Sequence, residues 1–403
     1  MRNFLKTGHA VLFYFAFISM FFFTILCMTF AVSTAQADVL VGTDGPPPSG
    51  AVRRFDNNGV FLGNFTSGGP NLDGPAAVHF GPDGNLYVLT SSNRVFRYNG
   101  STGVFIDEFI PLGILDDATD MIFGPDGDLY IANNEGNNPI GEGGEVLRFD
   151  GATGAIIGTF ILNGAGQGPP TNSDTVCEAM SMAFDPNGKF FYLGNDPRQC
   201  NGGTDAYNVM RFNAGTGIYI DTPFPAGFLG LYDPNGMTIG PDCNLYISSE
   251  GLAFGGNAAN PNVIYRLNLS SGDNIPDTIE EFVPSNGLLD NNGPFPPGTG
   301  LIEPEKIVFG PDGNLYVTSG DTAEVYRYDS ITGALIGGGA FIAQGLGQGS
   351  SDPKGITFFP GESLQCVLPI TTIPTLNEWG LIAMAGVLGI IAIFAIRRKK
   401  AVV

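Results

Sequence analysis

The sequence predicts an all-β fold in which six similar four-stranded sheets form a ring. Three observations lead to this prediction. A hairpin motif occurs five times, a strand motif with an arginine occurs six times, and the first and last repeats are each incomplete. Repeated four-stranded units are typical of β-propellers, whose closed ring removes exposed sheet edges. The predicted architecture is therefore a six-bladed β-propeller.

The hairpin motif joins two apolar strands through a turn of the Pro-Asp-Gly type. Its copies are HFGPDGNLYVLT, IFGPDGDLYIAN, AFDPNGKFFYLG, TIGPDCNLYISS and VFGPDGNLYVTS. Proline fits the first central position of a tight turn, and Asp or Asn followed by Gly accommodates the bend. These aspartates resemble calcium ligands, but their spacing lacks an EF-hand loop. We therefore expect them to form turns.

The third strand of each unit carries an arginine before an apolar residue and an Asp or Asn. The copies are AVRRFD, RVFRYN, EVLRFD, NVMRFN, VIYRLN and EVYRYD. A Gly-containing turn such as STG and a fourth strand such as VFIDEF complete the unit. Catalytic groups do not occur in six equivalent copies. We therefore expect these arginines to be structural and to pair with neighbouring blades or loops.

The two ends of the repeat region are predicted to close the ring together. The segment Val39–Phe65 lacks its opening strand, and Gly355–Phe359 supplies one strand without those that should follow. Joining them completes the sixth blade and removes an exposed edge. Residues 38–368 are accordingly expected to fold as one domain.

The N-terminus is predicted to be a signal peptide over residues 1–37. Two basic residues precede an apolar run that ends near Phe30, and Ala35 and Ala37 form the small-residue pattern that signal peptidase accepts. Cleavage is expected before Asp38. The alternative is an uncleaved anchor helix, because the apolar run is long for a signal peptide. With either outcome the rest of the chain is exported.

The C-terminal segment, residues 369–403, combines an apolar stretch with a basic end. No residue over 379–396 is charged, and a helix there would span about 27 Å at roughly 1.5 Å per residue. This length suffices for a short transmembrane helix. Residues 397–400 are all basic, and clustered basic residues stay on the cytoplasmic side. The body is therefore expected to face outward.

A short motif within residues 373–380 precedes this helix. Its positions are Ile373, Pro374, Thr375, Leu376, Trp379 and Gly380. Together with the helix and the basic end, it resembles the IPTL-CTERM signal, which exosortase-type transpeptidases of Gram-negative bacteria recognise. The resemblance implies an inner-membrane intermediate with its body in the periplasm. Processing near the motif would then pass the body to the cell surface or to extracellular material.

The composition fits an acidic exported protein. Charged residues make up only 14% of the chain and glycine occurs 59 times, as in turn-rich β structure. Six of the 18 basic residues and one of the 39 acidic residues lie in the two ends, which leaves a net charge of about −26 for the body. Such a surface repels phosphate backbones, so nucleic acid is excluded as a partner.

The long insertions are predicted to gather on one face of the ring. Strands alternate in direction, so the short first and third turns of each unit lie on one face, the short-turn face. The second turns and the connections between blades, which hold nearly every long insertion, lie on the other, the long-loop face. Long loops on a rigid scaffold often carry function. The binding site is therefore expected around the channel mouth on the long-loop face.

Oxygen-bearing side chains are expected at this mouth. The repeats resemble NHL-type and gluconolactonase-like six-bladed propellers throughout residues 38–368. The latter hold a divalent cation here through Glu, Asn and Asp side chains, and Ca²⁺ prefers such oxygen ligands. The alternative is a hydrated acidic rim that binds no metal. The candidate ligands are Glu178, Asn195, Asp196, Asn235, Glu250 and Glu305.

Four of the five cysteines lie beyond the signal peptide, which implies disulfides in an oxidising compartment. Cys177 and Cys200 flank one hairpin on the long-loop face and are predicted to pair. Cys243 and Cys366 lie at short turns of blades that are not neighbours, so their pairing stays open. His79 is the one histidine left, in a first strand away from the mouth. A His-dependent triad therefore has no candidate at the mouth.

These observations favour an exported, non-enzymatic binding module of the cell surface or extracellular matrix, with a polysaccharide or protein ligand. Association with exopolysaccharide is what the IPTL-CTERM resemblance implies. One alternative is a metal-dependent, lactonase-like hydrolase on the same propeller, which a bound metal and lactone hydrolysis would favour. A structural spacer, with neither ligand nor activity, is the other.

Overall fold

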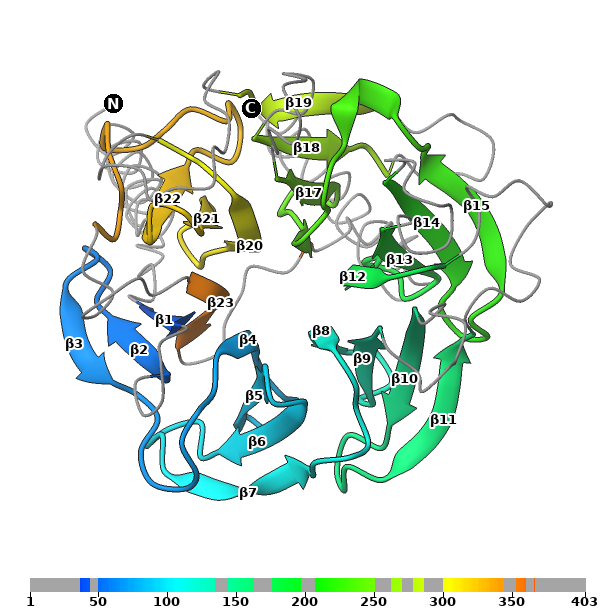
Figure 1. Ribbon diagram of the computed structural model, residues 1–403. Coiled ribbons are helices and arrows are strands. Elements are labelled where there is room, and N and C mark those ends of the chain that lie inside the picture. The colour runs from blue at the N-terminus through cyan, green and yellow to red at the C-terminus, as the bar shows by residue number, and fades with distance from the viewer. Residues whose placement is uncertain are drawn as a thin grey trace, which may run out of the picture. The chain divides into compact units, whose positions relative to one another are not determined.

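Six sheets form a ring in the computed structural model of the protein (Figure 1), and their innermost strands line a central channel. Within the part of the chain that is described, no α-helix occurs, and the one helical element is a single 3-10 turn at Phe228–Gly230. The predicted six-bladed propeller is confirmed. The structure describes residues 37–43, 50–134, 144–162, 176–196, 207–250, 262–269, 278–285, 300–343, 353–359 and 366.

Each blade is an antiparallel sheet whose first-named strand borders the channel. Blade 1 contains β23 (Pro353–Phe359), β1 (Asp38–Thr43), β2 (Ala51–Phe55) and β3 (Phe61–Asn64). Blade 2 contains β4 (Pro75–Phe80), β5 (Leu86–Thr90), β6 (Arg94–Tyr98) and β7 (Phe105–Ile110). Blade 3 contains β8 (Ala118–Phe123), β9 (Leu129–Asn133), β10 (Glu145–Phe149) and β11 (Ile156–Ile161).

The other three blades continue around the ring in chain order. Blade 4 contains β12 (Ala179–Phe184), β13 (Phe190–Asn195), β14 (Asn208–Asn213) and β15 (Tyr219–Phe224). Blade 5 contains β16 (Met237–Ile239), β17 (Leu245–Ser249), β18 (Val263–Leu267) and β19 (Ile279–Val283). Blade 6 contains β20 (Pro304–Phe309), β21 (Leu315–Ser319) and β22 (Glu324–Tyr328).

The two ends of the repeat region close the ring, as predicted. The first strand of the body, β1, lies between β2 and the last strand, β23. Val39 faces Phe358 and Val41 faces Ile356 in this antiparallel pair. Blade 1 is therefore assembled from both ends of the body, and no terminal sheet edge is left at this joint.

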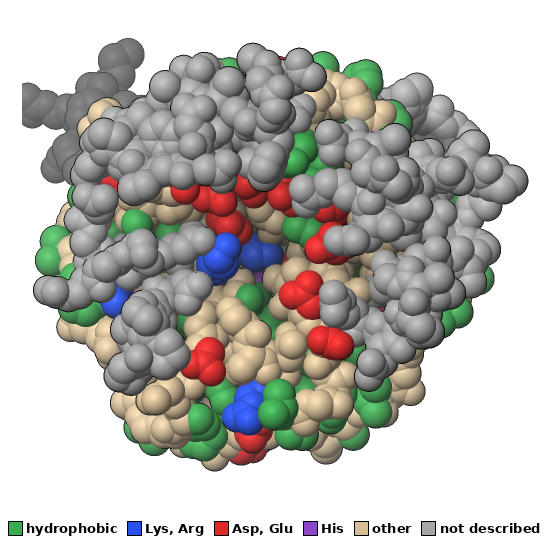
Figure 2. All heavy atoms as spheres, in the orientation of Figure 1, with side chains coloured by type: hydrophobic (Ala, Val, Ile, Leu, Met, Phe, Trp, Pro, Cys, Tyr) green, Lys and Arg blue, Asp and Glu red, His purple; other side chains and the backbone are tan. Residues whose placement is uncertain are grey.

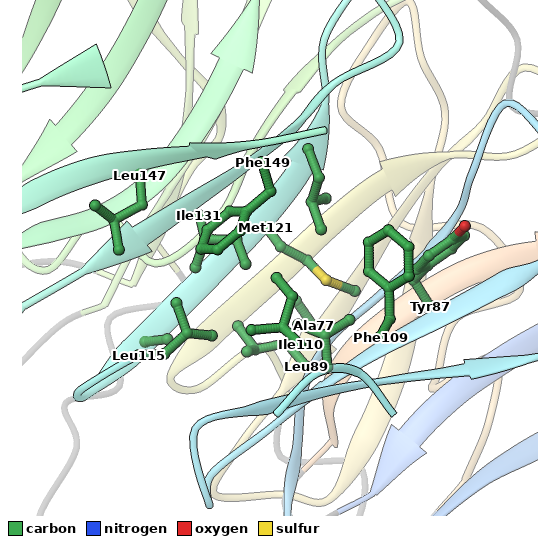
Figure 3. Close-up of a cluster of buried hydrophobic side chains, with 13 residues drawn as sticks. Ala77, Tyr87, Leu89, Phe109, Ile110, Leu115, Met121, Ile131, Leu147 and Phe149 are labelled. Carbon is green, nitrogen blue, oxygen red and sulfur yellow. The ribbon is translucent and has the colours of Figure 1, made fainter. Parts of the chain in front are cut away.

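The hydrophobic cores lie between neighbouring blades. Six clusters of buried side chains correspond to the six interfaces of the ring. Figure 3 shows the cluster between blades 2 and 3, where Tyr87 and Phe109 of blade 2 face Met121 and Phe149 of blade 3. Because every blade has apolar residues on both faces, none can bury its core alone, and the ring folds as a unit.

The repeated tyrosine of the second strand connects the hairpin turn to the next blade. In four blades its hydroxyl donates a hydrogen bond of 2.8–3.1 Å to the turn aspartate, whose other oxygen accepts a backbone N–H. Its ring meets a phenylalanine of the following blade edge-on, as Tyr87 meets Phe123 at 4.9 Å between centroids. These contacts confirm that the aspartates form the turns.

The six repeated arginines pair inside their own blades. Loop partners, one of the two expected kinds, occur for Arg148, Arg266 and Arg327, which reach turn aspartates. Among the described residues none of the six pairs with a carboxylate of a neighbouring blade. Three of them face their carboxylate directly across strands, where opposite charges attract most closely. The pairs are Arg54–Asp38, Arg97–Asp107, Arg148–Asp126, Arg148–Asp128, Arg211–Asp221, Arg266–Asp242, Arg266–Glu280 and Arg327–Asp312.

The outer edge of blade 6 departs from the four-strand pattern. Only two isolated bridges join this edge to β22, Tyr328 with Leu335 and Val325 with Ile342. Between them lie three consecutive glycines, of which Gly337 and Gly338 have φ values of 86° and 71°. Glycine offers no side chain for a sheet and tolerates such angles, so the strand is interrupted there.

The two faces of the ring also agree with the expectation. First and third turns touch each other, as where the Gly100 N–H bonds the Asn85 side chain at 3.3 Å. Second turns touch the segments that enter each blade, as where Glu250 N–H bonds Asp233 O at 3.4 Å. Most of the long insertions, the predicted signal peptide and the predicted helix at 379–396 lie outside the described residues. Within the described residues, no helix has the length and apolarity to span a membrane.

Candidate functional site

Charged side chains gather around the channel in the view of Figure 2, where acidic groups border a small basic cluster and the purple histidine lies deeper. The mouth on the long-loop face is built from residues just before each first strand and just after each second strand. All six predicted ligand residues are described. They fall into two separate hydrogen-bond networks.

The first network belongs to blade 4 and holds Glu178, Asn195 and Asp196. Asn195 is fully buried, and its Oδ1 accepts the backbone N–H groups of Cys177 at 2.8 Å and Glu178 at 3.3 Å. Its Nδ2 donates to Asn208 Oδ1 at 3.2 Å. Asp196 is also fully buried. The amide of Asn195 therefore fastens the chain entering blade 4, which is a structural role.

The second network connects blades 5, 6 and 1. Asn235 Nδ2 donates to Glu250 Oε2 at 2.8 Å, and Lys354 Nζ donates to Glu305 Oε1 at 3.0 Å. Both carboxylates are buried, with Glu250 7% and Glu305 6% exposed. The two carboxylates and their partners together come from blades 5, 6 and 1, so this network borders the joint where the ring closes.

Glu250 is the carboxyl with the most altered acidity in this network. Burial raises its pKa to about 10, and the charges of Asp233, Glu303 and Glu305 add to the rise, while Lys354 opposes it. The carboxyl is therefore protonated at neutral pH. It can donate a hydrogen bond as well as accept the one from Asn235.

Glu250→Gln is expected to stabilise the protein at alkaline pH. A carboxyl whose folded pKa is raised from 4.5 to about 10 contributes its full stability below pH 4.5 and loses it as pH rises towards 10. The neutral amide removes this loss. We expect the variant to be at least about 2 kcal/mol more stable at pH 9 and unchanged near pH 4.5, in urea denaturation. Equal behaviour of Glu250→Gln and the exposed control Glu281→Gln at pH 9 would contradict this assignment.

A cross-channel bridge lies beneath the mouth, and the sequence did not predict it. Lys306 Nζ on β20 of blade 6 donates to Asn235 O at 2.7 Å, to Asp120 Oδ1 at 3.3 Å and to Thr119 O at 3.4 Å. Thr119 and Asp120 lie on β8 of blade 3, directly opposite in the ring. Asp120 Oδ2 also accepts Met182 N–H of blade 4 at 3.0 Å.

A repeat alignment would have given the signal for this bridge. Lys306 and Asp120 both stand three residues before the phenylalanine that ends the first strand, where other repeats have Ala77 or Ser181. One basic and one acidic residue at the same level of opposite blades can meet across a narrow channel. Of the predicted carboxylates, Asp196 and Glu250 also share a repeat position, four residues after the repeated tyrosine, but they lie on neighbouring blades.

The described residues show no group of three or more His, Cys, Asp or Glu side chains placed to hold a metal ion. A cation at the mouth therefore stays a prediction. Lys354 already pairs with Glu305 at 3.0 Å, so a cation that binds Glu305 would have to displace this amine.

Three of the four cysteines of the body, Cys177, Cys243 and Cys366, lie among the described residues. Cys243, in the β16–β17 turn, forms a disulfide with Cys366, with 5.0 Å between the Cα atoms. The pairing that the sequence left open is thus settled. Cys177 is also disulfide-bonded, but its predicted partner Cys200 lies outside the described residues.

Residues 371–398 match the IPTL-CTERM motif. The chain carries an IPTL-CTERM motif. This motif implies that the protein is exported and sorted to the surface of a Gram-negative bacterium. It also implies processing by an exosortase-type enzyme. No curated protein matches the sequence.

Solved structures resemble this chain in fold. The propeller in a crystal structure of a nidogen/laminin complex has a TM-score of 0.52 and 14% identity, covering 82% of this chain and 100% of that one. A gluconolactonase from Xanthomonas campestris has a TM-score of 0.45 and 15% identity, covering 73% of this chain and 85% of that one. The first likeness supports the fold alone, and the second is too distant to support an argument.

Proposed function

We propose that this chain is a sorted envelope protein whose propeller binds an uncharged, hydroxyl-rich polysaccharide at the mouth on the long-loop face, without catalysing a reaction. The observation that supports this most is the paired network of Glu305, Lys354, Glu250 and Asn235. It offers hydrogen-bond donors and acceptors side by side. Its charges are balanced, because Lys354 pairs with Glu305 and Glu250 is protonated.

Sugar hydroxyls both donate and accept hydrogen bonds, so they suit such a mixed surface. Lys354, the Asn235 amide and the protonated Glu250 can each donate a hydrogen bond to a hydroxyl. The oxygens of Glu250, Glu305 and Asn235 can accept one. Polyanions are disfavoured because the body carries a net charge of about −26. The long insertions around the mouth would add further contacts.

Catalysis finds less support at this mouth. His79, the one histidine in the body, lies on β4 within the channel and senses the charges of Asp120 and Lys306, below the mouth network. The predicted Asn195 ligand is committed to two backbone N–H groups. A lactonase-like reaction would need other residues at the mouth.

Retention of polysaccharide on the immobilised full chain tests this proposal. Deproteinised extracellular polysaccharide of the producing strain is passed over the wild type and over the double variant Glu305→Gln/Lys354→Met, which leaves no buried charge unpaired. We expect the bound hexose to fall at least tenfold. Lys189→Met, in the short β12–β13 turn of the opposite face, is the matched control and should retain binding.

Two results would overturn the proposal. One is equal retention by the wild type and the double variant. The other is calcium-dependent hydrolysis of gluconolactone by the wild type, abolished in Glu250→Gln. Calorimetric titration with Ca²⁺, with Glu178→Ala as the comparison, separates a metal site from an acidic rim: heat of binding in the wild type alone supports the metal.

A further inference from the structure

A separate cavity lies in the channel on the short-turn side of the Lys306–Asp120 bridge. Its volume is about 570 Å³, and the innermost strands of all six blades line it. Cys366, held by its disulfide to Cys243, borders it near the hairpin turns that carry Pro125 and Asn187. Drug-sized ligands occupy pockets of roughly 300–1,000 Å³ in proteins. The cavity therefore has the size of a ligand site.

Aromatic and aliphatic side chains line the cavity at the level where the innermost strands end. The residues that end the innermost strands contribute Phe80, Phe123, Phe184, Ile239 and Phe309. These rings are fixed by packing, as Phe123 and Phe309 each meet a tyrosine of the preceding blade within 4.9 Å between centroids. A wall of this kind favours an apolar ligand body, because it keeps its shape when empty.

Three polar side chains stand at equivalent positions of the repeat, each one residue before an apolar residue near the end of an innermost strand. They are His79 of blade 2, Thr238 of blade 5 and Thr357 of blade 1, and all three line the cavity. None of them makes a side-chain hydrogen bond to any residue that the structure describes. Polar groups inside a protein are normally hydrogen-bonded. These three side chains therefore offer donors and acceptors that a ligand could satisfy.

The charged groups at the inner end are already satisfied. Lys306 has three acceptors, and both oxygens of Asp120 accept a hydrogen bond. Burial lowers the pKa of His79, although Asp120 opposes this effect, so its imidazole is neutral at neutral pH. Asp185, which also lines the cavity, accepts the backbone N–H groups of Lys189 and Phe190 at 2.6 and 2.7 Å. The ionised groups of the lining are therefore already paired, and an ionised ligand would enter without a free counter-charge.

We propose that this cavity is a second binding site, for an uncharged, mainly apolar small molecule with one or two hydroxyl, amine or carbonyl groups. The apolar part would lie between the phenylalanine rings. Its polar group would reach His79, Thr238 or Thr357. The Lys306–Asp120 bridge separates this site from the mouth, so it does not depend on the polysaccharide proposal.

Fluorescence titration of the purified full chain tests this site with two probes of the same ring skeleton. Phenylnaphthylamine is neutral and carries one N–H, whereas anilinonaphthalenesulfonate is anionic. We expect saturable binding of one phenylnaphthylamine per chain and at least tenfold weaker binding of the sulfonate. Absence of saturable binding of the neutral probe would overturn the proposal, and would indicate that the chain itself fills the cavity.

Substitutions assign the signal to the cavity. Thr238→Phe fills it and should weaken phenylnaphthylamine binding at least tenfold, whereas Thr159→Phe, on the exposed outer strand β11, should leave it unchanged. Both variants contain the apolar C-terminal segment, so nonspecific binding of the probe to that segment is the same in both and does not affect the comparison. Thr238→Val with Thr357→Val keeps the shape of the cavity, removes two hydroxyls, and should weaken binding severalfold even if Thr238→Phe fails to fold. Two results together would overturn the assignment. One is equal phenylnaphthylamine affinity of the wild type and the double valine variant, and the other is an equal loss of affinity in Thr238→Phe and Thr159→Phe.

Discussion

Replacing Cys243 and Cys366 together by serine is expected to lower the free energy of unfolding by about 5 kcal/mol. The disulfide closes a loop whose ends are 123 residues apart, and the entropy that a crosslink removes from the unfolded chain grows with loop length. It also ties the chain just after β23, the strand that completes blade 1, to the β16–β17 turn of blade 5. The end of the closing strand is thereby held against fraying.

Denaturation of the oxidised wild type and of the double serine variant measures this difference. Reductant alone is not an adequate test, because Cys177 is disulfide-bonded as well. Reducing the double variant isolates the contribution of Cys177, and reducing the wild type should then give the sum of both losses. Equal stability of the two oxidised proteins would contradict the prediction and would assign closure of the ring to the β23–β1 pairing alone.

The architecture was predictable because its signals are local and repeated. A turn such as Pro82-Asp83-Gly84 and its following tyrosine specify one hairpin within a dozen residues, and further copies specify the ring. Closure by Gly355–Phe359 followed from counting strands. The three glycines at 337–339 interrupt the outer strand of blade 6, which the repeat pattern alone had made regular.

The site was less predictable because it depends on contacts across the channel. Lys306 and Asp120 are 186 residues apart and meet only because their strands face each other in a closed ring. The disulfide of Cys366 depends on the path of the chain after β23, which no repeat specifies. Asn195 was a candidate ligand by type and position, yet its amide turns to the backbone N–H groups of its own blade. Sequence gives the residue and the strand, but not the rotamer.

Gly355→Ala is expected to destabilise the protein by about 3 kcal/mol, because it overpacks the joint at which the ring closes. A Cβ atom at Gly355 would lie 2.7 Å from Val78 Cγ2 and 3.2 Å from Val78 N. Gly42 on the neighbouring strand β1 is equally tight, with 2.8 Å to Pro75 Cβ and 2.9 Å to Val78 Cγ2. Blade 1 therefore approaches blade 2 through two glycines, and any side chain there pushes the closing strands away from β4.

A double-mutant cycle with Val78→Ala tests this explanation in urea denaturation. Removing the methyl group that Gly355→Ala would strike should recover at least about 1 kcal/mol relative to the sum of the two single losses. Gly339→Ala, where a Cβ meets nothing within 4 Å, is the matched control and should change stability little. Additive losses in the cycle would show that Gly355 is needed for its backbone freedom. Coupled losses would show that the close approach of blades 1 and 2 holds the ring shut. The same approach would then fix the geometry of the cavity that β23 and β4 line.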